Sequence, residues 1–327
     1  MLNNILVVGG AGYIGVHIVD LLCDMGHKVI VLDNLYSGYK ENINKKADFI
    51  LGDITNKSLL KSVFENNKID SVIHMAALKA VADSNKDTRN YTENNVIGSI
   101  NLISSCIDFN VKKFIFSSTA AVYGNPKYNP IDENHTSLPI NHYGYTKLLV
   151  ENYLSWISNI EEINFVSLRY FNAAGYSKKT NLIKYKEKAP ENLLPIIMEV
   201  ANGDRDNFSI FGSDYNTSDG TCIRDYIHVL DLAIAHMKAL DYLENNKINQ
   251  IINLSTGVGS SVLDVVKTAE NCTNRKINYL FKGRRAGDPD SLISKTQKAK
   301  EILNWEAKYS LIDIVESMWS IYKKAPK

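Results

Sequence analysis

Tyr143 and Lys147 stand four residues apart in the segment HYGYTK. On a helix this spacing places both side chains on one face. A tyrosine has a pKa of about 10, so it serves as a base near neutrality only where a nearby cation favours the phenolate. The pair is therefore a candidate general base with its electrostatic partner, although many amphipathic helices carry the same spacing by chance. Tyr145 offers no such pair, because Leu149 lies four residues after it.

Three hydroxyl side chains, Ser117, Ser118 and Thr119, follow one another at the end of the apolar run 113–118. In open α/β sheets ligands bind outside the carboxyl ends of the strands, which is where these hydroxyls are expected. A hydroxyl there can hydrogen-bond a substrate oxygen and pass its proton to a phenolate. Serines at strand ends also cap helices, so this run alone does not separate the two roles.

A glycine-rich segment, GGAGYIG, follows the apolar run ILVVGG and precedes a helical pattern. Gly9, Gly12 and Gly15 are its regularly spaced glycines. Missing side chains let the backbone approach a pyrophosphate, and the N–H groups at the start of the next helix can bind it. A glycine-rich turn can also serve packing alone. Here the strand before it, the helix after it and an acid at the end of the next strand favour dinucleotide binding.

That acid is Asp33 in VLDNL, eighteen residues after Gly15. A carboxylate at this position can accept hydrogen bonds from the adenosine ribose hydroxyls, and it would repel a 2′-phosphate. NAD is therefore favoured over NADP as the cofactor. Asp53 ends the third apolar run and is expected beside the adenine ring.

Short apolar runs alternate with helix-length segments through the first half of the chain. Near-continuous apolar runs are typical of strands buried on both faces, and strand–helix alternation predicts a parallel sheet between two helical layers. We therefore predict an α/β fold with a doubly wound parallel sheet, the Rossmann fold. Strands are expected at 5–10, 29–34, 48–53, 71–76, 113–118 and 164–172, and helices at 13–25, 58–66, 91–109 and 143–157.

Beyond residue 172 the pattern loosens. Residues 176–190 are polar and rich in lysine, which predicts a surface loop. A smaller C-terminal α/β substrate domain is predicted over 173–327, joined to an NAD-binding domain over 1–172, and parts of 224–255 are candidates for packing back on the first domain. The further helices are expected at 192–202, 228–243, 262–272, 295–303 and 311–322, with a short strand at 208–211.

Composition narrows the classes of function. The chain has 327 residues, 45% of them hydrophobic, and a formal net charge of +1, which leaves no global field to gather nucleic acid or an anionic membrane. Its four cysteines are too far apart for a zinc site, so we expect reduced thiols and no metal. We find no signal peptide and no apolar stretch long enough to span a bilayer, which predicts a cytoplasmic location.

The glycine loop, the hydroxyl run and the Tyr–Lys pair occur in this order at the ends of the expected elements. In this the chain resembles the extended short-chain dehydrogenase/reductase family. Further segments resemble the UDP-glucose (UDP-galactose) 4-epimerases of that family and cover nearly the whole chain. They are LDNL, LKAVADS, NNV, SSTAAVYGNP, YGYTK, LRYFNAAG, ENLLP, SIFG, DGTCIRDYIHVLDLA, INLSTGVGSSVLDVV and RRAGD.

The resemblance implies a role for each residue at a matching position. Tyr143 would be the base, Lys147 its electrostatic partner, and Thr119, where many relatives have serine, the proton relay. Guanidinium groups at the substrate positions suit a diphosphate. The NAD-contacting positions would be Gly9, Gly12, Tyr13, Ile14, Gly15, Asp33, Asn34, Asp53, Ile54, Lys79, Asn94, Tyr143, Lys147 and Phe171. The positions holding a UDP-sugar would be Asn172, Asn192, Leu193, Phe211, Arg224, Arg285, Asp288 and Leu292.

The reaction that the resemblance implies is inversion of carbon 4 of a UDP-hexose through a transient 4-keto sugar. Nucleotide-sugar dehydratases share the fold and the pair but need acidic groups just after the strand-end hydroxyl, where this chain has Ala120 and Ala121. A decarboxylase would lack an acidic partner in a similar way. The alternative from another class is a non-enzymatic NAD-sensing protein, which would not need the Tyr–Lys pair.

Leu292 lies four residues after the aspartate of RRAGD, where some close relatives carry tyrosine. The less bulky side chain suggests room for UDP-GlcNAc and UDP-GalNAc besides UDP-glucose and UDP-galactose. Relatives are commonly homodimers joined by a four-helix bundle, which 91–109 and 143–157 would supply here. Both segments could equally pack on the sheet alone, so the sequence leaves the oligomeric state open.

Overall fold

Seven parallel strands form the central sheet of the computed structural model, which describes residues 2–179, 182–186, 190, 192–285 and 288–323. Their order is β10-β6-β5-β4-β1-β2-β3, so the direction of connection reverses between β1 and β4. This reversal places a ligand crevice at the carboxyl ends of those strands. The predicted Rossmann sheet is confirmed. Its strands are β1 (Asn4–Val8), β2 (Lys28–Asp33), β3 (Asp48–Leu51), β4 (Ser71–His74), β5 (Lys113–Thr119), β6 (Asn164–Tyr170) and β10 (Gln250–Leu254).

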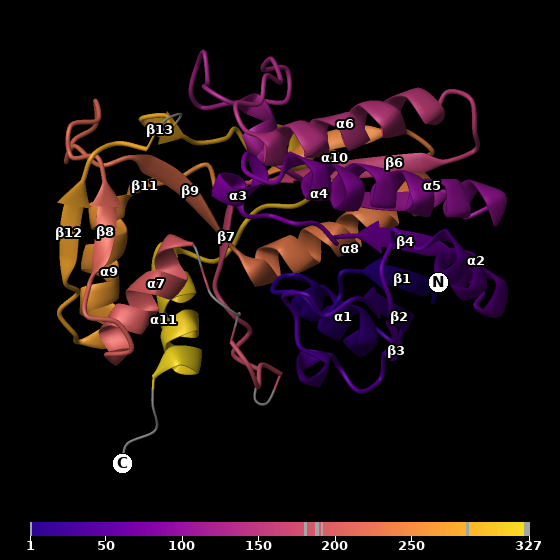
Figure 1. The fold of residues 1–327 in the computed structure, drawn as a ribbon, viewed down its shortest axis with the longest axis horizontal. Helices are drawn as coiled ribbons and strands as arrows, with labels where there is room; N and C mark the ends of the chain where they lie inside the picture. Colours follow the sequence, from indigo (N-terminus) through magenta and orange to yellow (C-terminus); the bar gives the residue numbers. More distant parts are fainter. Residues whose placement is uncertain (1, 180–181, 187–189, 191, 286–287, 324–327) are drawn as a thin grey trace.

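Helices cover both faces of this sheet (Figure 1). Ile5 and Val7 of β1 share one apolar cluster with residues of α1 (Gly15–Asp24) and α8 (Val229–Asn245). Leu6 and Val8 share a second cluster with residues of the helices on the other face. Burial of alternate side chains on opposite faces is the reason that these strands read as continuous apolar runs. The helices of the second face are α2 (Lys57–Asn66), α5 (Gly98–Asp108) and α6 (His142–Ile157).

A smaller unit occupies the left half of Figure 1. It contains a four-stranded mixed sheet, a two-stranded sheet and three helices that pack around their own apolar cluster. The first sheet has β7 (Asn172–Ala174), β9 (Ile223–His228), β11 (Gly259–Ser261) and β13 (Ser291–Leu292); the second has β8 (Phe208–Phe211) and β12 (Tyr279–Lys282). The helices are α7 (Leu193–Asn202), α9 (Val262–Thr273) and α11 (Leu311–Tyr322).

The chain passes between the two units more than once. After β9 it returns to the large sheet for α8 and β10, and β10 pairs in parallel with β6 at the sheet edge. It returns again for α10 (Gln297–Leu303), where Ala299 and Leu303 join the apolar cluster beneath α1 and α8. Segments far apart in sequence therefore meet at the joint of the two units.

The helix expected at 91–109 is interrupted. It consists of α4 (Thr88–Tyr91), a π-helical segment η2 (Thr92–Ile97) and α5. Within η2 the side-chain amide of Asn95 accepts a hydrogen bond from the N–H of Leu78 at 2.8 Å and donates one to its carbonyl at 2.9 Å. Such bulges frequently occur at functional sites, and this one anchors the loop that follows β4.

The loop expected at 176–190 is only partly at the surface. Tyr176 is buried, and Tyr185 stacks on Tyr39 of the first unit with ring centroids 4.9 Å apart. Residues 180–181 and 187–189 of this loop lie outside the described residues. The aromatic rings therefore tie the loop to the first unit.

None of the helices in the described part of the chain combines the length and the apolar character needed to cross a membrane. All four cysteines are free, and Cys23 and Cys106 are buried. Across the same residues, no three His, Cys, Asp or Glu side chains gather in a way that could hold a metal ion.

Candidate active site

The glycine loop turns tightly between β1 and α1. Gly9 has a φ of +84°, and a Cβ on it would clash with the backbone of Ala76 after β4. A Cβ on Gly15 would overlap the carbonyl oxygen of Gly9. The N-cap residue of α1, Ile14, makes no side-chain capping bond, so the helix start keeps backbone donors suited to an anion. These residues fit the pyrophosphate of a dinucleotide.

Two acidic side chains, Asp33 and Asp53, accept hydrogen bonds at the ends of the neighbouring strands β2 and β3. The carboxylate of Asp33 is buried and accepts hydrogen bonds from the N–H groups of Ala11, at 2.9 Å, and Leu35, at 2.8 Å. Asn34 donates to Asp53 at 2.7 Å. Partial burial works to raise the pKa of Asp53, but hydrogen bonds from Thr55 and Asn34 lower it overall. The Asp53 carboxylate therefore stays charged near neutrality at the edge where a ribose would lie.

The remaining predicted cofactor residues surround this edge. Tyr13 donates from its hydroxyl to the carbonyl of Gly175 at 2.6 Å, and the ammonium of Lys79 lies 5.9 Å from the centre of the Tyr13 ring. Asn94 is half-buried in η2. The Ile54 side chain is buried against the backbone of α5, where a Cβ on Gly98 would meet it. The structure thus assembles these residues from the loops after β1, β3 and β4 and from η2.

Lys147 lies beneath the carboxyl end of β5. Its side chain is 3% exposed, and its ammonium donates a hydrogen bond to the carbonyl of Ser117 at 2.8 Å. The same nitrogen lies 6.0 Å from the centre of the Tyr143 ring and 4.8 Å from that of Phe116. Thr119 hydrogen-bonds to Tyr143. The three residues predicted to be catalytic are therefore brought together at one strand end.

The ionisation of this pair differs from the sequence-based expectation, which was a lowered phenol pKa. Burial raises the pKa of Tyr143 to about 12, against the hydrogen bond from Thr119. Burial also lowers the pKa of Lys147 to about 7, against the charge of Glu151. Removing both groups from water penalises both charged forms, so the chain's own cation does not outweigh desolvation. A phenolate here needs further positive charge.

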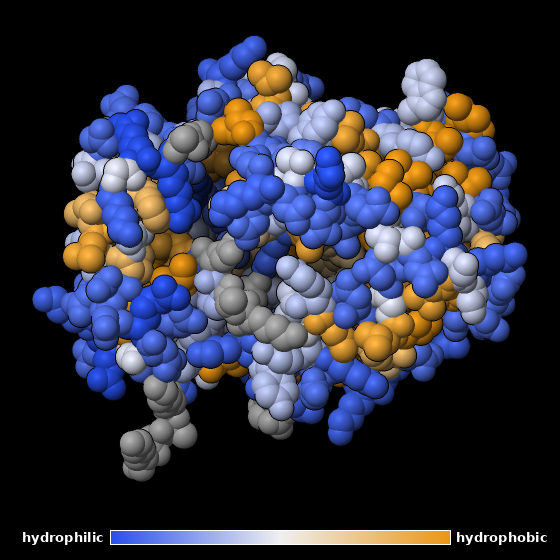
Figure 2. Space-filling view, in the orientation of Figure 1, coloured by the Kyte–Doolittle hydropathy of each residue, from blue (hydrophilic) through white to orange (hydrophobic). Residues whose placement is uncertain are grey.

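The predicted substrate residues lie on the second unit. In the space-filling view the surface is hollowed where the two units meet (Figure 2). Arg224 of β9 donates to the Asp288 carboxylate at 3.2 Å and to the Pro289 carbonyl at 2.9 Å. The guanidinium of Arg285 lies 3.9 Å from the centre of the Phe211 ring. The guanidinium of Arg224 is thus held in place by hydrogen bonds, and that of Arg285 lies against an aromatic ring.

Leu292 of the second unit packs against residues that follow strands of the first unit. It lies in β13, whose register places it beside Arg224, and it packs against an apolar cluster that contains Ala120 and Phe171. Asn172, which follows Phe171, is exposed at the start of β7. The other two predicted residues, exposed Asn192 and half-buried Leu193, lie at the N-terminus of α7.

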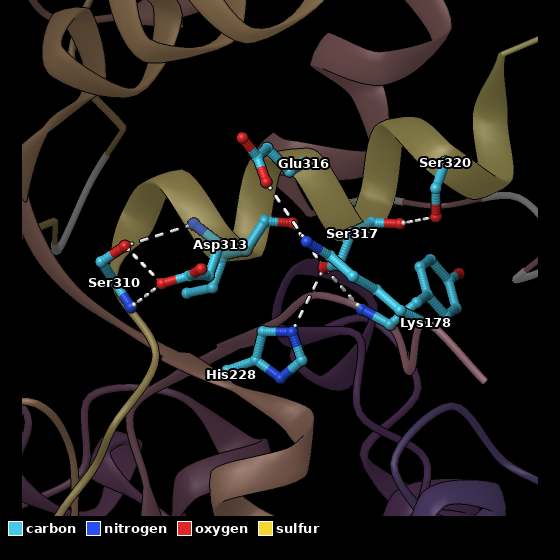
Figure 3. A network of polar contacts seen from close by, with 9 residues as sticks. Lys178, His228, Ser310, Asp313, Glu316, Ser317 and Ser320 are labelled. Carbon is cyan, nitrogen blue, oxygen red and sulfur yellow. Dashed lines mark hydrogen bonds and ion pairs between the residues drawn. The ribbon is translucent and has the colours of Figure 1, made fainter.

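A polar network links β9 to α11 within the second unit (Figure 3). His228, at the end of β9, hydrogen-bonds through Nε2 to the hydroxyl of Ser317 on α11 at 3.2 Å. That hydroxyl accepts a further bond from the N–H of Tyr176 at 3.1 Å. Because Tyr13 of the glycine loop bonds to neighbouring Gly175, the network links the first loop of the chain to its last described helix.

Sequence reasoning missed the buried ion pair of Glu151 and Arg169. Glu151 follows Lys147 by four residues on α6, so it continues the face that carries the Tyr–Lys pair. Arg169 interrupts the apolar run of β6 and binds Glu151 through two hydrogen bonds of 3.0 and 2.6 Å. The signals were present, namely a third side chain at the same spacing and a charge within a buried strand.

A glycine loop at the switch point, with half-buried Tyr143 and buried Lys147 at the end of β5, defines a dinucleotide-dependent enzyme of the short-chain dehydrogenase/reductase type. The sequence profile of the NAD dependent epimerase/dehydratase family matches residues 5–255. The chain belongs to this family.

Individual relatives match over nearly the full length. A UDP-glucose 4-epimerase of Halalkalibacterium halodurans is 44% identical over 324 residues, which cover 98% of this chain and 96% of the relative. The crystal structure of UDP-glucose 4-epimerase from Brucella ovis in complex with NAD superposes with a TM-score of 0.94 at 38% identity, covering 98% of each chain. The UDP-Glc/GlcNAc 4-epimerase of Campylobacter jejuni superposes with a TM-score of 0.84 at 38% identity, covering 97% of this chain and 98% of that one.

Proposed function

We propose that this chain is an NAD-dependent 4-epimerase of UDP-hexoses that interconverts UDP-glucose and UDP-galactose. The observation that carries the proposal is the arrangement of Thr119, Tyr143 and Lys147 at the end of β5, next to the glycine loop. The full-length similarity to UDP-glucose 4-epimerases supports it. A dehydratase is disfavoured because Ala120 and Ala121 cannot transfer protons.

Some residues of the chain are proposed to bind the substrate, and others to transfer the proton. When bound, NAD would supply the acceptor for the hydride of carbon 4, and its positive charge would favour the phenolate of Tyr143. Tyr143 takes the proton of the sugar 4-hydroxyl through Thr119, while Lys147 stabilises the phenolate. Arg224 and Arg285 hold the diphosphate, so the 4-keto sugar turns about its phosphate linkage without leaving. The hydride would then return to the opposite face of carbon 4, while Tyr143 returns the proton to the 4-oxygen through Thr119.

The cofactor residues are proposed to act through the groups described above. The N–H groups after Gly12 bind the pyrophosphate, and the Asp33 carboxylate accepts bonds from the ribose hydroxyls. Asn34, Asp53 and Ile54 border the adenine. The residues proposed to border the nicotinamide half are Tyr13, Lys79, Asn94 and Phe171. Those proposed to hold the uridine half, together with the two arginines, are Asn172, Asn192, Leu193, Phe211 and Asp288.

The test is incubation of the purified chain with UDP-galactose, followed by chromatographic quantification of UDP-glucose. Formation of UDP-glucose without added NADH, with a transient absorbance of reduced nicotinamide, supports the proposal. A 4-keto-6-deoxy product would indicate a dehydratase. Binding of NAD with no turnover of any UDP-hexose would indicate a sensor instead.

The substrate range is proposed to include UDP-GlcNAc and UDP-GalNAc. Leu292, which packs against the cluster that contains Ala120 and Phe171, is less bulky than tyrosine, and the similar Campylobacter jejuni protein is a UDP-Glc/GlcNAc 4-epimerase. We expect Leu292→Tyr to reduce kcat/KM for UDP-GlcNAc at least about tenfold relative to UDP-glucose, since a clash with one substituent is worth on the order of 1–3 kcal/mol. Side-by-side assays of both sugar pairs measure this, with Leu292→Met as the control. An unchanged ratio contradicts the proposal.

The chain is further proposed to act in the cytoplasm as a homodimer through the outer faces of η2, α5 and α6. Trp156 and Ile160 are 70% and 66% exposed there, and Ile97 is also exposed. Figure 2 shows hydrophobic residues gathered over this part of the surface. Because an apolar patch of this kind is typical of an interface, we expect Trp156→Glu to convert a dimer to a monomer in light scattering, with Tyr36→Glu as an exposed aromatic control. A wild-type protein that is monomeric at micromolar concentration would overturn the proposed homodimer.

A further inference from the structure

Three functional side chains of helix α6 follow one another at intervals of four residues. Glu151 lies one turn beyond Lys147, and Lys147 lies one turn beyond Tyr143. Glu151 is 1% exposed, and both of its carboxylate oxygens are bound by Arg169 of β6, at 3.0 and 2.6 Å. Arg169 is itself buried and covers the ring of Tyr123, with its guanidinium 4.8 Å from the ring centre. A charged pair is thus buried one helical turn beyond Lys147.

This pair is poorly explained by stability alone. Buried ion pairs seldom stabilise a fold more than well-packed apolar side chains of similar volume. Nη1 of Arg169 has no hydrogen-bond partner among the described residues, so the pair is not fully satisfied.

We propose that Glu151 is a positioning residue that keeps Lys147 protonated within the buried site, while Arg169 limits how strongly it does so. This inference rests on the proposed function, in which the ammonium of Lys147 stabilises the Tyr143 phenolate. Burial lowers the pKa of Lys147 to about 7, and among the described residues the charge of Glu151 opposes this. Without that carboxylate, less of the lysine would carry a charge at neutral pH.

The other groups around Lys147 do not supply negative charge. His74 of β4 is fully buried, and burial together with the charge of Lys147 lowers its pKa to about 3, so it stays neutral. Tyr143 is protonated in the chain alone, with its pKa raised to about 12 by burial. Ser117 contributes only its carbonyl oxygen. Among the described residues the negative charge at Lys147 therefore comes from Glu151, on which Arg169 acts through their ion pair.

Two substitutions that break the same ion pair separate this role from a structural one. Glu151→Gln removes negative charge and Arg169→Met removes positive charge, so we expect the pKa of Lys147 to fall in the first and rise in the second, by about one unit each. The measurement is an NMR titration of the NAD-bound protein carrying lysine labelled at the ε-carbon. The Lys147 resonance is assigned by its loss in Lys147→Met. A shift in the same direction in both variants, or none in Glu151→Gln, overturns the proposal.

The pH profile of epimerisation gives a second readout. The alkaline limb of kcat/KM is expected to move to lower pH in Glu151→Gln and to higher pH in Arg169→Met. Glu199→Gln is the matched control, because it breaks an Arg–Glu pair held by bonds of 3.1 and 2.9 Å on the second unit and is expected to move neither readout. If the wild type does not epimerise UDP-hexoses, the proposed function fails, while the NMR titration still decides the role of Glu151.

A folding defect in Glu151→Gln would not prevent the test. The double variant Glu151→Gln/Arg169→Met carries no buried charge at either position. Its Lys147 pKa is expected to lie about one unit below that of Arg169→Met alone. Equal pKa values in these two proteins overturn the proposal.

Discussion

Replacing Tyr143 by phenylalanine is expected to lower kcat for epimerisation of UDP-galactose by about 10³-fold, within the range usual for loss of a positioned general base. Phenylalanine keeps the ring that packs near Lys147 but removes the oxygen that exchanges the proton. Because burial raises the pKa of this phenol to about 12, its removal relieves no buried charge in the chain alone. The variant is therefore expected to fold normally and to retain NAD. Steady-state kinetics and the nicotinamide content of the purified protein measure both effects.

Tyr145→Phe is the matched control for this substitution. Tyr145 lies two residues away on the same helix, is 48% exposed and has no lysine four residues on. Its loss is expected to change kcat less than about twofold, as is usual for surface substitutions. A Tyr143→Phe protein that still turns over at the wild-type rate would remove the basis of the proposed mechanism.

Lys147→Met is expected to lower kcat by about 10²-fold at neutral pH, since the phenolate of Tyr143 loses its nearest cation. The remaining activity is expected to rise about tenfold per pH unit up to the highest pH at which the protein is stable. The reason is that the variant's phenol ionises only well above neutrality. A profile parallel to that of the wild type, measured from pH 6 upward, argues against Lys147 as the partner of Tyr143.

The same variant tests the burial of Lys147 through stability. Burial lowers its pKa to about 7, whereas an unfolded lysine titrates near its ordinary value of about 10.4. Between these values the unfolded chain binds this proton more strongly, so the free energy of unfolding rises with pH by up to about 1.4 kcal/mol per unit. Methionine at this position does not titrate, so it adds no pH dependence to the free energy of unfolding. Denaturant titrations should show the wild type gaining stability relative to Lys147→Met as pH rises from 7 to 9, and a constant difference would contradict the burial.

Local patterns were sufficient for the large sheet and for much of the site. Apolar runs between helix-length segments identified six of its strands, because a strand buried on both faces must be apolar throughout. The glycine loop and Asp33 were identifiable because close backbone approach and ribose binding restrict residue types at fixed separations along the chain. The Tyr143–Lys147 spacing was readable because four residues make about one helical turn. Each of these depends on neighbours in sequence.

Tertiary structure alone decided features that depend on residues far apart in sequence. The seventh strand, β10, joins the large sheet only because the chain returns from the second unit to pair with β6. The contacts of Arg224 with Asp288 and of Leu292 with Phe171 likewise bring separate elements together. The pKa of Tyr143 is raised, whereas the Tyr–Lys spacing predicted a lowered pKa, and the reason is similar. The pKa of a buried group depends on how much water the whole fold removes from it, and no spacing along the chain records that quantity.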